Sequence, residues 1–121
     1  MDKIFIDGLE TSGIIGIHPR EQHIPQRIRV SASVSYNIHE AALRDDISQT
    51  INYSTLSRHI LAFIEKSHYR TIEAFIESLA DEILNSYPVH DILLRVEKPD
   101  AVPAAASVGV EIFRKNKNLE V

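Results

Sequence analysis

The stretch Arg27-Ile28-Arg29-Val30-Ser31-Ala32-Ser33-Val34-Ser35-Tyr36 alternates strictly between two kinds of side chain. One side carries the apolar residues Ile28, Val30, Ala32, Val34 and Tyr36, and the other carries two arginines and three serines. Successive side chains of a β-strand point to opposite faces of a sheet. The stretch therefore predicts a long strand with one buried and one polar face.

The residues before this strand also favour extended structure. Residues 3–8 and 12–17 are expected to form one long strand that is bent or bulged near Gly8 and Gly13. Residues 18–25 then form a polar loop that contains two prolines. This segment is expected to return the chain antiparallel to the first strand.

The pattern changes to helical spacing after Asn37. Short helical turns are expected around His39 to Leu43, and Ser54 is a plausible N-cap for a helix that reaches Ile64. A broader apolar stripe from Ile72 to Leu84 predicts a second helix, which Pro88 closes.

Two more strands, at about 90–97 and 106–114, complete the order ββααββ. This order predicts an α+β fold in which a four-stranded antiparallel sheet carries two helices on one face. The serine-bearing side of the central strand offers little to pack against within one chain. That face either contacts water or lines the inside of a larger assembly.

Composition limits the classes of function. The 121 residues fit one domain, 1–121, with residues 115–121 expected as a flexible tail. A net charge of −4 argues against nucleic acid as a partner, and the absence of cysteine excludes disulfides and thiolate chemistry. The sequence has no apolar run of membrane-helix length and no signal-peptide pattern at its start, so we expect a cytoplasmic protein without a membrane partner.

Four polar residues are candidates for a site. Lys98 ends an apolar strand and precedes Pro99, so it is either a proton carrier or an ordinary polar residue at a strand's end. Glu21 lies in the polar loop, where it is either a solvated carboxylate or a site residue. Tyr53 stands before the first long helix, as a packing residue or a functional one.

Glu73 lies in the first turn of the second long helix. The helix dipole alone explains a carboxylate there, but such a carboxylate can also accept paired hydrogen bonds from the guanidine-like edge of a pterin or guanine. The six histidines lack metal-ligand spacing, so we expect no metal.

Several short segments occur in a recognisable order: Ile15-Gly16-Ile17 before Glu21-Gln22, Asn52-Tyr53, Ile72-Glu73, Glu97-Lys98-Pro99 and Ser107-Val108-Gly109-Val110-Glu111-Ile112. Together they resemble the dihydroneopterin aldolase family of folate biosynthesis. The resemblance implies the T-fold, in which subunits join their sheets into a barrel, as a homo-octamer or tetramer. The serine-bearing face would then line the barrel.

The resemblance also implies a reaction and a site. The expected reaction is the retro-aldol cleavage of 7,8-dihydroneopterin by a lyase that needs neither cofactor nor metal nor Schiff base. Lys98, Tyr53 and Glu21 would be catalytic, with Lys98 partly neutral at working pH, and Tyr53 would come from the adjacent subunit. Glu73 and Ile72, with Tyr53 and Glu21, would bind the pterin.

Two alternatives stay open. The stretch Ile51-Asn52-Tyr53-Ser54-Thr55 also resembles dihydroneopterin triphosphate 2′-epimerase, which shares the fold. A non-catalytic T-fold protein that binds a pterin or purine is the second alternative, although it would need only Glu73. Thr71, just before Ile72-Glu73, departs from the residue that relatives often carry, so details of the pterin cradle can differ.

Overall fold

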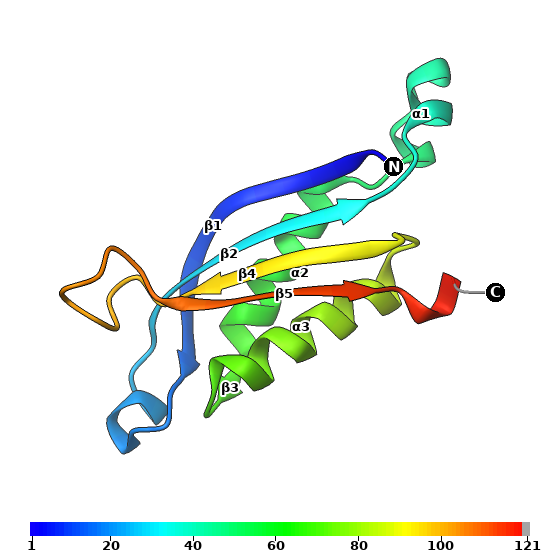
Figure 1. Ribbon diagram of the computed structural model, residues 1–121. Coiled ribbons are helices and arrows are strands. Elements are labelled where there is room, and N and C mark those ends of the chain that lie inside the picture. The colour runs from blue at the N-terminus through cyan, green and yellow to red at the C-terminus, as the bar shows by residue number, and fades with distance from the viewer. Residues whose placement is uncertain (120–121) are drawn as a thin grey trace.

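The computed structural model describes residues 1–119 and contains a five-stranded sheet in the order β3-β1-β2-β4-β5 (Figure 1). The strands are β1 (Lys3–Ile15), β2 (Gln26–Ser35), β3 (His68–Tyr69), β4 (Asp91–Glu97) and β5 (Gly109–Lys115). The helices are α1 (His39–Arg44), α2 (Tyr53–Lys66) and α3 (Ile72–Ser86), with short 3-10 turns at η1 (Pro19–Gln22), η2 (Ile47–Gln49) and η3 (Lys117–Leu119). The predicted α+β class and the order ββααββ are confirmed.

The alternating stretch forms the central strand β2. It pairs antiparallel with β1 on one side and with β4 on the other, with Val30 opposite Val96. Ile28, Val30 and Val34 are fully buried beneath α2 and α3, which both lie behind the sheet in Figure 1. The predicted apolar face of this strand is therefore the floor of the core.

β1 is one strand with a bulge, as predicted. Its pairing with β2 shifts register between Ile6 and Leu9, and Gly8 adopts a φ of 74° there, which favours glycine. Gly13 has a different role. A Cβ at Gly13 would lie 2.8 Å from the carbonyl oxygen of Ile64, so the missing side chain lets α2 pack closely on β1.

A polar side chain caps the start of each long helix. The predicted cap Ser54 is wrong: Asn52 caps α2, its Oδ1 accepting the backbone N–H groups of Ser54 and Thr55. This places Tyr53 at the first position of α2. Thr71 caps α3 by accepting the N–H of Ala74.

β3 was not predicted, because two residues are too few to show a period. His68 and Tyr69 pair in parallel with Ile14 and Ile15, which joins the start of α3 to the end of β1. This strand is added to the four-stranded antiparallel sheet expected above.

The C-terminal segment differs from the expected flexible tail up to residue 119. Lys115 belongs to β5, and Asn116 is 3% exposed. The Asn116 amide donates to the carbonyls of Leu84 and Val89, at 2.9 and 2.8 Å, which fixes the chain beneath α3. Residues 120–121, the rest of the expected tail, lie outside the described residues.

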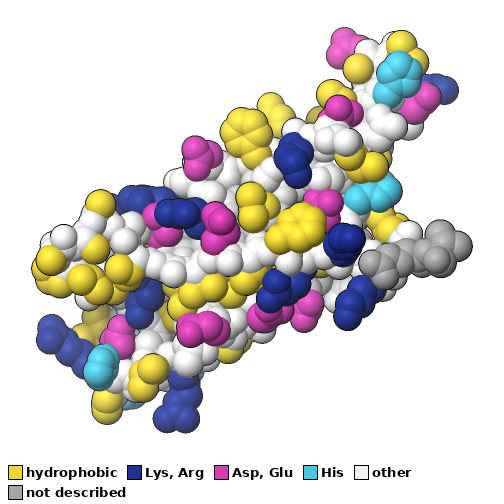
Figure 2. Space-filling view, viewed as in Figure 1, with side chains coloured by type: hydrophobic (Ala, Val, Ile, Leu, Met, Phe, Trp, Pro, Cys, Tyr) yellow, Lys and Arg dark blue, Asp and Glu magenta, His cyan; other side chains and the backbone are white. Residues whose placement is uncertain are grey.

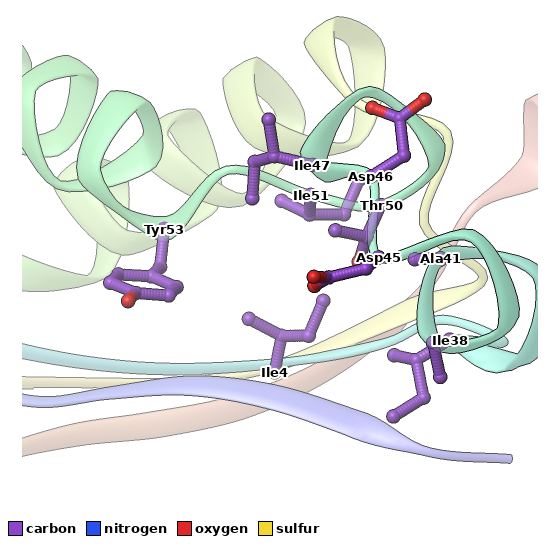
Figure 3. A pocket seen from close by; sticks show the side chains of 10 residues that line it. Ile4, Ile38, Ala41, Asp45, Asp46, Ile47, Thr50, Ile51 and Tyr53 are labelled. Carbon is purple, nitrogen blue, oxygen red and sulfur yellow. The ribbon is translucent and has the colours of Figure 1, made fainter.

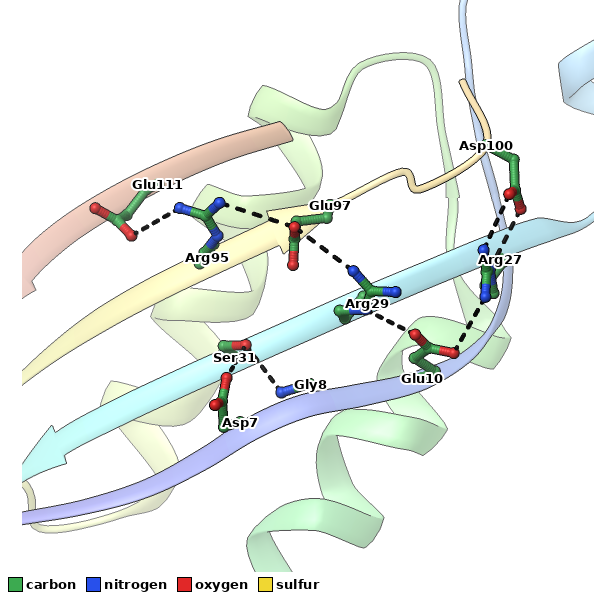
Figure 4. Close-up of polar contacts among 10 residues, drawn as sticks. All are labelled: Asp7, Gly8, Glu10, Arg27, Arg29, Ser31, Arg95, Glu97, Asp100 and Glu111. Carbon is green, nitrogen blue, oxygen red and sulfur yellow. Dashed lines mark hydrogen bonds and ion pairs between the residues drawn. The ribbon is translucent and has the colours of Figure 1, made fainter. Parts of the chain in front are cut away.

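The sheet face opposite the helices is uncovered within this chain. Figure 2 shows acidic, basic and hydrophobic side chains mixed over it. A row of ion pairs crosses the strands there, in which Glu10 contacts Arg27 and Arg29, and Arg29 contacts Glu97 (Figure 4). Phe5, which pairs with Ser33, is nevertheless 70% exposed on this face. None of the helices within residues 1–119 has the length and apolar character needed to cross a membrane.

Candidate active site

Lys98 and Glu21, 77 residues apart in sequence, meet at one end of the sheet. Lys98 follows β4 directly, and its backbone N–H donates to Val108 O at 2.8 Å, so the strand's pairing holds its backbone. Its Nζ donates to Glu21 Oε2 at 3.0 Å. The side chains of Lys98 and Glu21 are 15% and 25% exposed, so the pair is largely shielded but reachable from solvent.

The η1 turn holds Glu21 over Gly16. Within the turn Glu21 donates its backbone N–H to His18 O, and the His18 N–H donates to Glu21 Oε1 at 3.3 Å. Gln22 donates its side-chain amide to Gly16 O. A Cβ on Gly16 would lie 2.3 Å from the Cβ of Glu21, so only glycine leaves room for the carboxylate in this position.

Gln26 belongs to this cluster of side chains, and the sequence analysis missed it. Its Nε2 donates to Ile15 O at 2.8 Å and to Glu21 Oε2 at 3.1 Å. The hydrogen bond from Lys98 lowers the pKa of the Glu21 carboxyl, and the bond from Gln26 lowers it further. A signal was available: in the alternation of β2, Gln26 is the polar residue on the side of Ile28 and Val30.

Ile72 and Glu73 begin α3 beside this loop. Tyr69, just before them, pairs with Ile15, and its carbonyl accepts the N–H of Gly16 at 3.0 Å. Ile72 is half-buried against the core, whereas Glu73 is exposed in the first turn. The structure thus brings the start of α3 to the same end of the sheet as Glu21. Within residues 1–119 no hydrogen bond or ion pair joins Glu73 to Glu21 or Lys98.

Tyr53 lies apart from the other predicted site residues. It occupies the first position of α2, and 14 residues of helix, about 21 Å at 1.5 Å per residue, separate it from the end next to β3. Tyr53 is 62% exposed and borders an open pocket of about 510 Å³ (Figure 3). The pocket is lined by Ile4, Ile38, Ala41, Ala42, Asp45, Asp46, Ile47, Thr50, Ile51 and Tyr53. Tyr53 therefore cannot reach Lys98 of its own chain.

Within residues 1–119, no three histidine, aspartate or glutamate side chains come together in a way that could hold a metal ion. The chemistry available at the Lys98 end is proton transfer and hydrogen bonding by one amine, one ionised carboxylate and one fixed amide.

Comparisons with known proteins identify the family of this chain. The family model described as "FolB: Dihydroneopterin aldolase" matches residues 4–113. Dihydroneopterin aldolase of Haemophilus influenzae is 31% identical, over 94% of this chain and 97% of its own length. Folic acid synthesis protein FOL1 of Dictyostelium discoideum is also 31% identical, over all of this chain, which spans 19% of that longer protein.

A solved structure shares the fold. The Escherichia coli dihydroneopterin aldolase, crystallised in complex with neopterin, superposes with a TM-score of 0.91 at 28% identity, covering 94% of this chain and 99% of that one. The likeness confirms the T-fold architecture within one subunit. From the family match and these relatives, the chain belongs to the dihydroneopterin aldolase family, the lyases of that name in folate biosynthesis.

Proposed function

We propose that this lyase binds 7,8-dihydroneopterin and cleaves it by a retro-aldol step into 6-hydroxymethyl-7,8-dihydropterin and glycolaldehyde. The observation that carries the proposal is the hydrogen bond from Lys98 to Glu21, because it places an amine and a carboxylate together at a half-open end of the sheet. The similar Escherichia coli enzyme, solved with neopterin, supports a pterin as the ligand.

Glu73 and Ile72 would hold the pterin. The first amides of a helix have no acceptor inside the helix, and Thr71 takes only that of Ala74. The exposed Glu73 carboxylate can then accept from the amino group and ring N–H of the pterin, while a backbone N–H at this terminus donates to the ring carbonyl. Burial of Ile72 against the core fixes the turn that presents these groups.

The cleavage needs an electron sink and two proton transfers. Lys98 accepts the proton of the 2′-hydroxyl, through a water molecule, as the C1′–C2′ bond breaks and glycolaldehyde departs. The bond's electrons pass into the N5=C6 imine of the dihydropterin, so neither metal nor Schiff base is required. A proton then returns to C1′, with Glu21 and Tyr53 relaying or orienting it through water.

A second copy of the chain would complete the site. Tyr53 begins α2, and the helix is about 21 Å long, so Tyr53 lies at the opposite end of α2 from β3 and from the Lys98 end of the sheet. The Tyr53 that serves this pocket would therefore come from a neighbouring subunit. Exposed apolar side chains on the uncovered sheet face, including Phe5, Leu93 and Phe113, support assembly through the sheets. The proposed assembly is a ring tetramer or an octamer of two rings.

The test is to incubate the purified protein with dihydroneopterin and, separately, with its triphosphate, and to separate the products by chromatography. Release of glycolaldehyde supports the proposal. An epimerised product without glycolaldehyde would show that the protein is an epimerase and contradict the proposed cleavage. Binding without any product would show a pterin-binding protein without this activity. A monomer in light scattering at micromolar concentration would contradict the shared site.

A further inference from the structure

Gln26 and Lys98 approach one carboxylate from neighbouring strands. Gln26 opens β2 on the helix-covered side that Ile28 and Val30 continue, and Lys98 follows β4 on the side of Val96, the partner of Val30. Both side chains lie at the end of the sheet where β2 begins and β4 ends. They donate to the same atom, Glu21 Oε2, at 3.1 and 3.0 Å.

The amide of Gln26 is held independently of Glu21. An amide nitrogen carries two hydrogens, and one of them goes to the backbone carbonyl of Ile15 at 2.8 Å. That carbonyl belongs to the end of β1, so the donor's position is fixed by the sheet. The second hydrogen therefore sets where Glu21 Oε2 lies, and the η1 turn supplies the carboxylate.

We propose that Gln26 is a positioning residue of the reaction, which holds Glu21 in place when the Lys98 amine turns from the carboxylate to the substrate. The inference rests on the proposed function for the roles of Glu21 and Lys98. With Gln26 present, Oε2 keeps one fixed donor throughout the cycle. Without Gln26, Glu21 Oε2 would have no fixed donor once Lys98 moved, and the carboxylate would rotate away from the water that carries the proton.

Two variants separate this role from a structural one. Gln26→Leu keeps the volume but has no donor, and we expect kcat to fall roughly 10- to 100-fold with little change in KM, the range for one lost hydrogen bond to an ionised group. Gln26→Glu places two carboxylates about 3 Å apart, which share a proton and titrate as a pair. Its kcat should recover as pH falls, because a shared proton restores a donor.

Asn85→Asp is the charge-matched control for Gln26→Glu. It adds the same charge on exposed surface near the end of α3 and keeps the oxygen that accepts from Asn118. In the control and in the wild type, kcat should not show this rise as pH falls. If Gln26→Glu has the same profile as the control, or Gln26→Leu turns over at the wild-type rate, the positioning role is wrong.

A measurement without substrate tests the contact itself. Carbon-13 NMR titration of the Glu21 carboxyl in the intact protein should show its pKa moving upward in Gln26→Leu and staying in place in Asn85→Asp. If the wild type shows no cleavage, the proposed function fails while this titration still decides whether Gln26 controls Glu21. An unchanged titration in a folded Gln26→Leu protein would overturn the inference. Should Gln26→Leu not fold, the pH profile and titration of Gln26→Glu decide in its place.

Discussion

Replacing Gly16 by alanine should disable the site by displacing a neighbouring side chain. Gly16 has no positive φ, so its backbone accepts alanine; the constraint is space. The new Cβ would lie 2.3 Å from the Cβ of Glu21, 2.4 Å from its Cδ and 2.6 Å from its Oε1. Carbon atoms pack at about 3.5 Å, so the Glu21 side chain must retreat by about 1 Å.

A shift of this size breaks the arrangement around Lys98. The hydrogen bond from Lys98 Nζ to Glu21 Oε2 is 3.0 Å long, and another ångström takes it beyond hydrogen-bond length. A misplacement of about 1 Å at a catalytic centre costs on the order of 100-fold in rate. Overpacking should also lower the free energy of unfolding by about 1–3 kcal/mol.

Gly8→Ala is the matched control. Gly8 has a φ of 74° but nothing within 4 Å of a new Cβ, so the substitution strains the backbone without moving a neighbour. We expect Gly8→Ala to lower the free energy of unfolding by about 1–2 kcal/mol, as Gly16→Ala does, and to leave kcat near the wild-type value.

The assay pairs steady-state cleavage of dihydroneopterin with urea unfolding of both variants. Loss of turnover in Gly16→Ala but not in Gly8→Ala, at similar stability, supports the displacement of Glu21. A Gly16→Ala enzyme that is folded and retains more than half of the wild-type kcat would refute the reasoning from space.

Three further predictions concern single side chains. Lys98→Ala should abolish cleavage while pterin binding, measured by calorimetry, survives, whereas Glu73→Ala should mainly destroy binding; substantial turnover in the lysine variant would remove Lys98 from the chemistry. Folding lowers the pKa of Glu21, so the stability that its carboxylate contributes is fully present above the unfolded pKa of about 4.3 and is lost as pH falls through the lower folded pKa. The unfolding free energies of wild type and Glu21→Gln should therefore converge in acid. A difference that stays constant with pH would argue against the ionised contact. Asn116→Ala leaves two buried carbonyls without a donor and should lower the unfolding free energy by about 1–3 kcal/mol in urea titrations, with no effect expected if the C-terminal segment is loose.

Most of the fold could be predicted from the sequence because its periodic segments are long. Ten residues of strict alternation identified the central strand, and the stripe from Ile72 to Leu84 identified α3, with the buried faces as observed. The shortest strand was not predicted, because it contains too few residues to show a period. β3 has two residues and no period, and the cap at Asn52 depends on which side-chain oxygen reaches the helix amides.

Candidate site residues were predicted from residue type and motif order, and their geometry came only with the tertiary structure. Motif order singled out Glu21, Lys98 and Glu73, since polar residues at strand and helix ends are visible in a sequence. Their contacts depend on long-range pairing: Lys98 meets Glu21 across 77 residues, because β4 lies beside β2 and the η1 turn folds over Gly16. The same pairing brings in Gln26, and the length of α2 keeps Tyr53 away from Lys98 in its own chain. Local periodicity determines elements, whereas distances between elements arise from strand order and close packing, which only the folded chain defines.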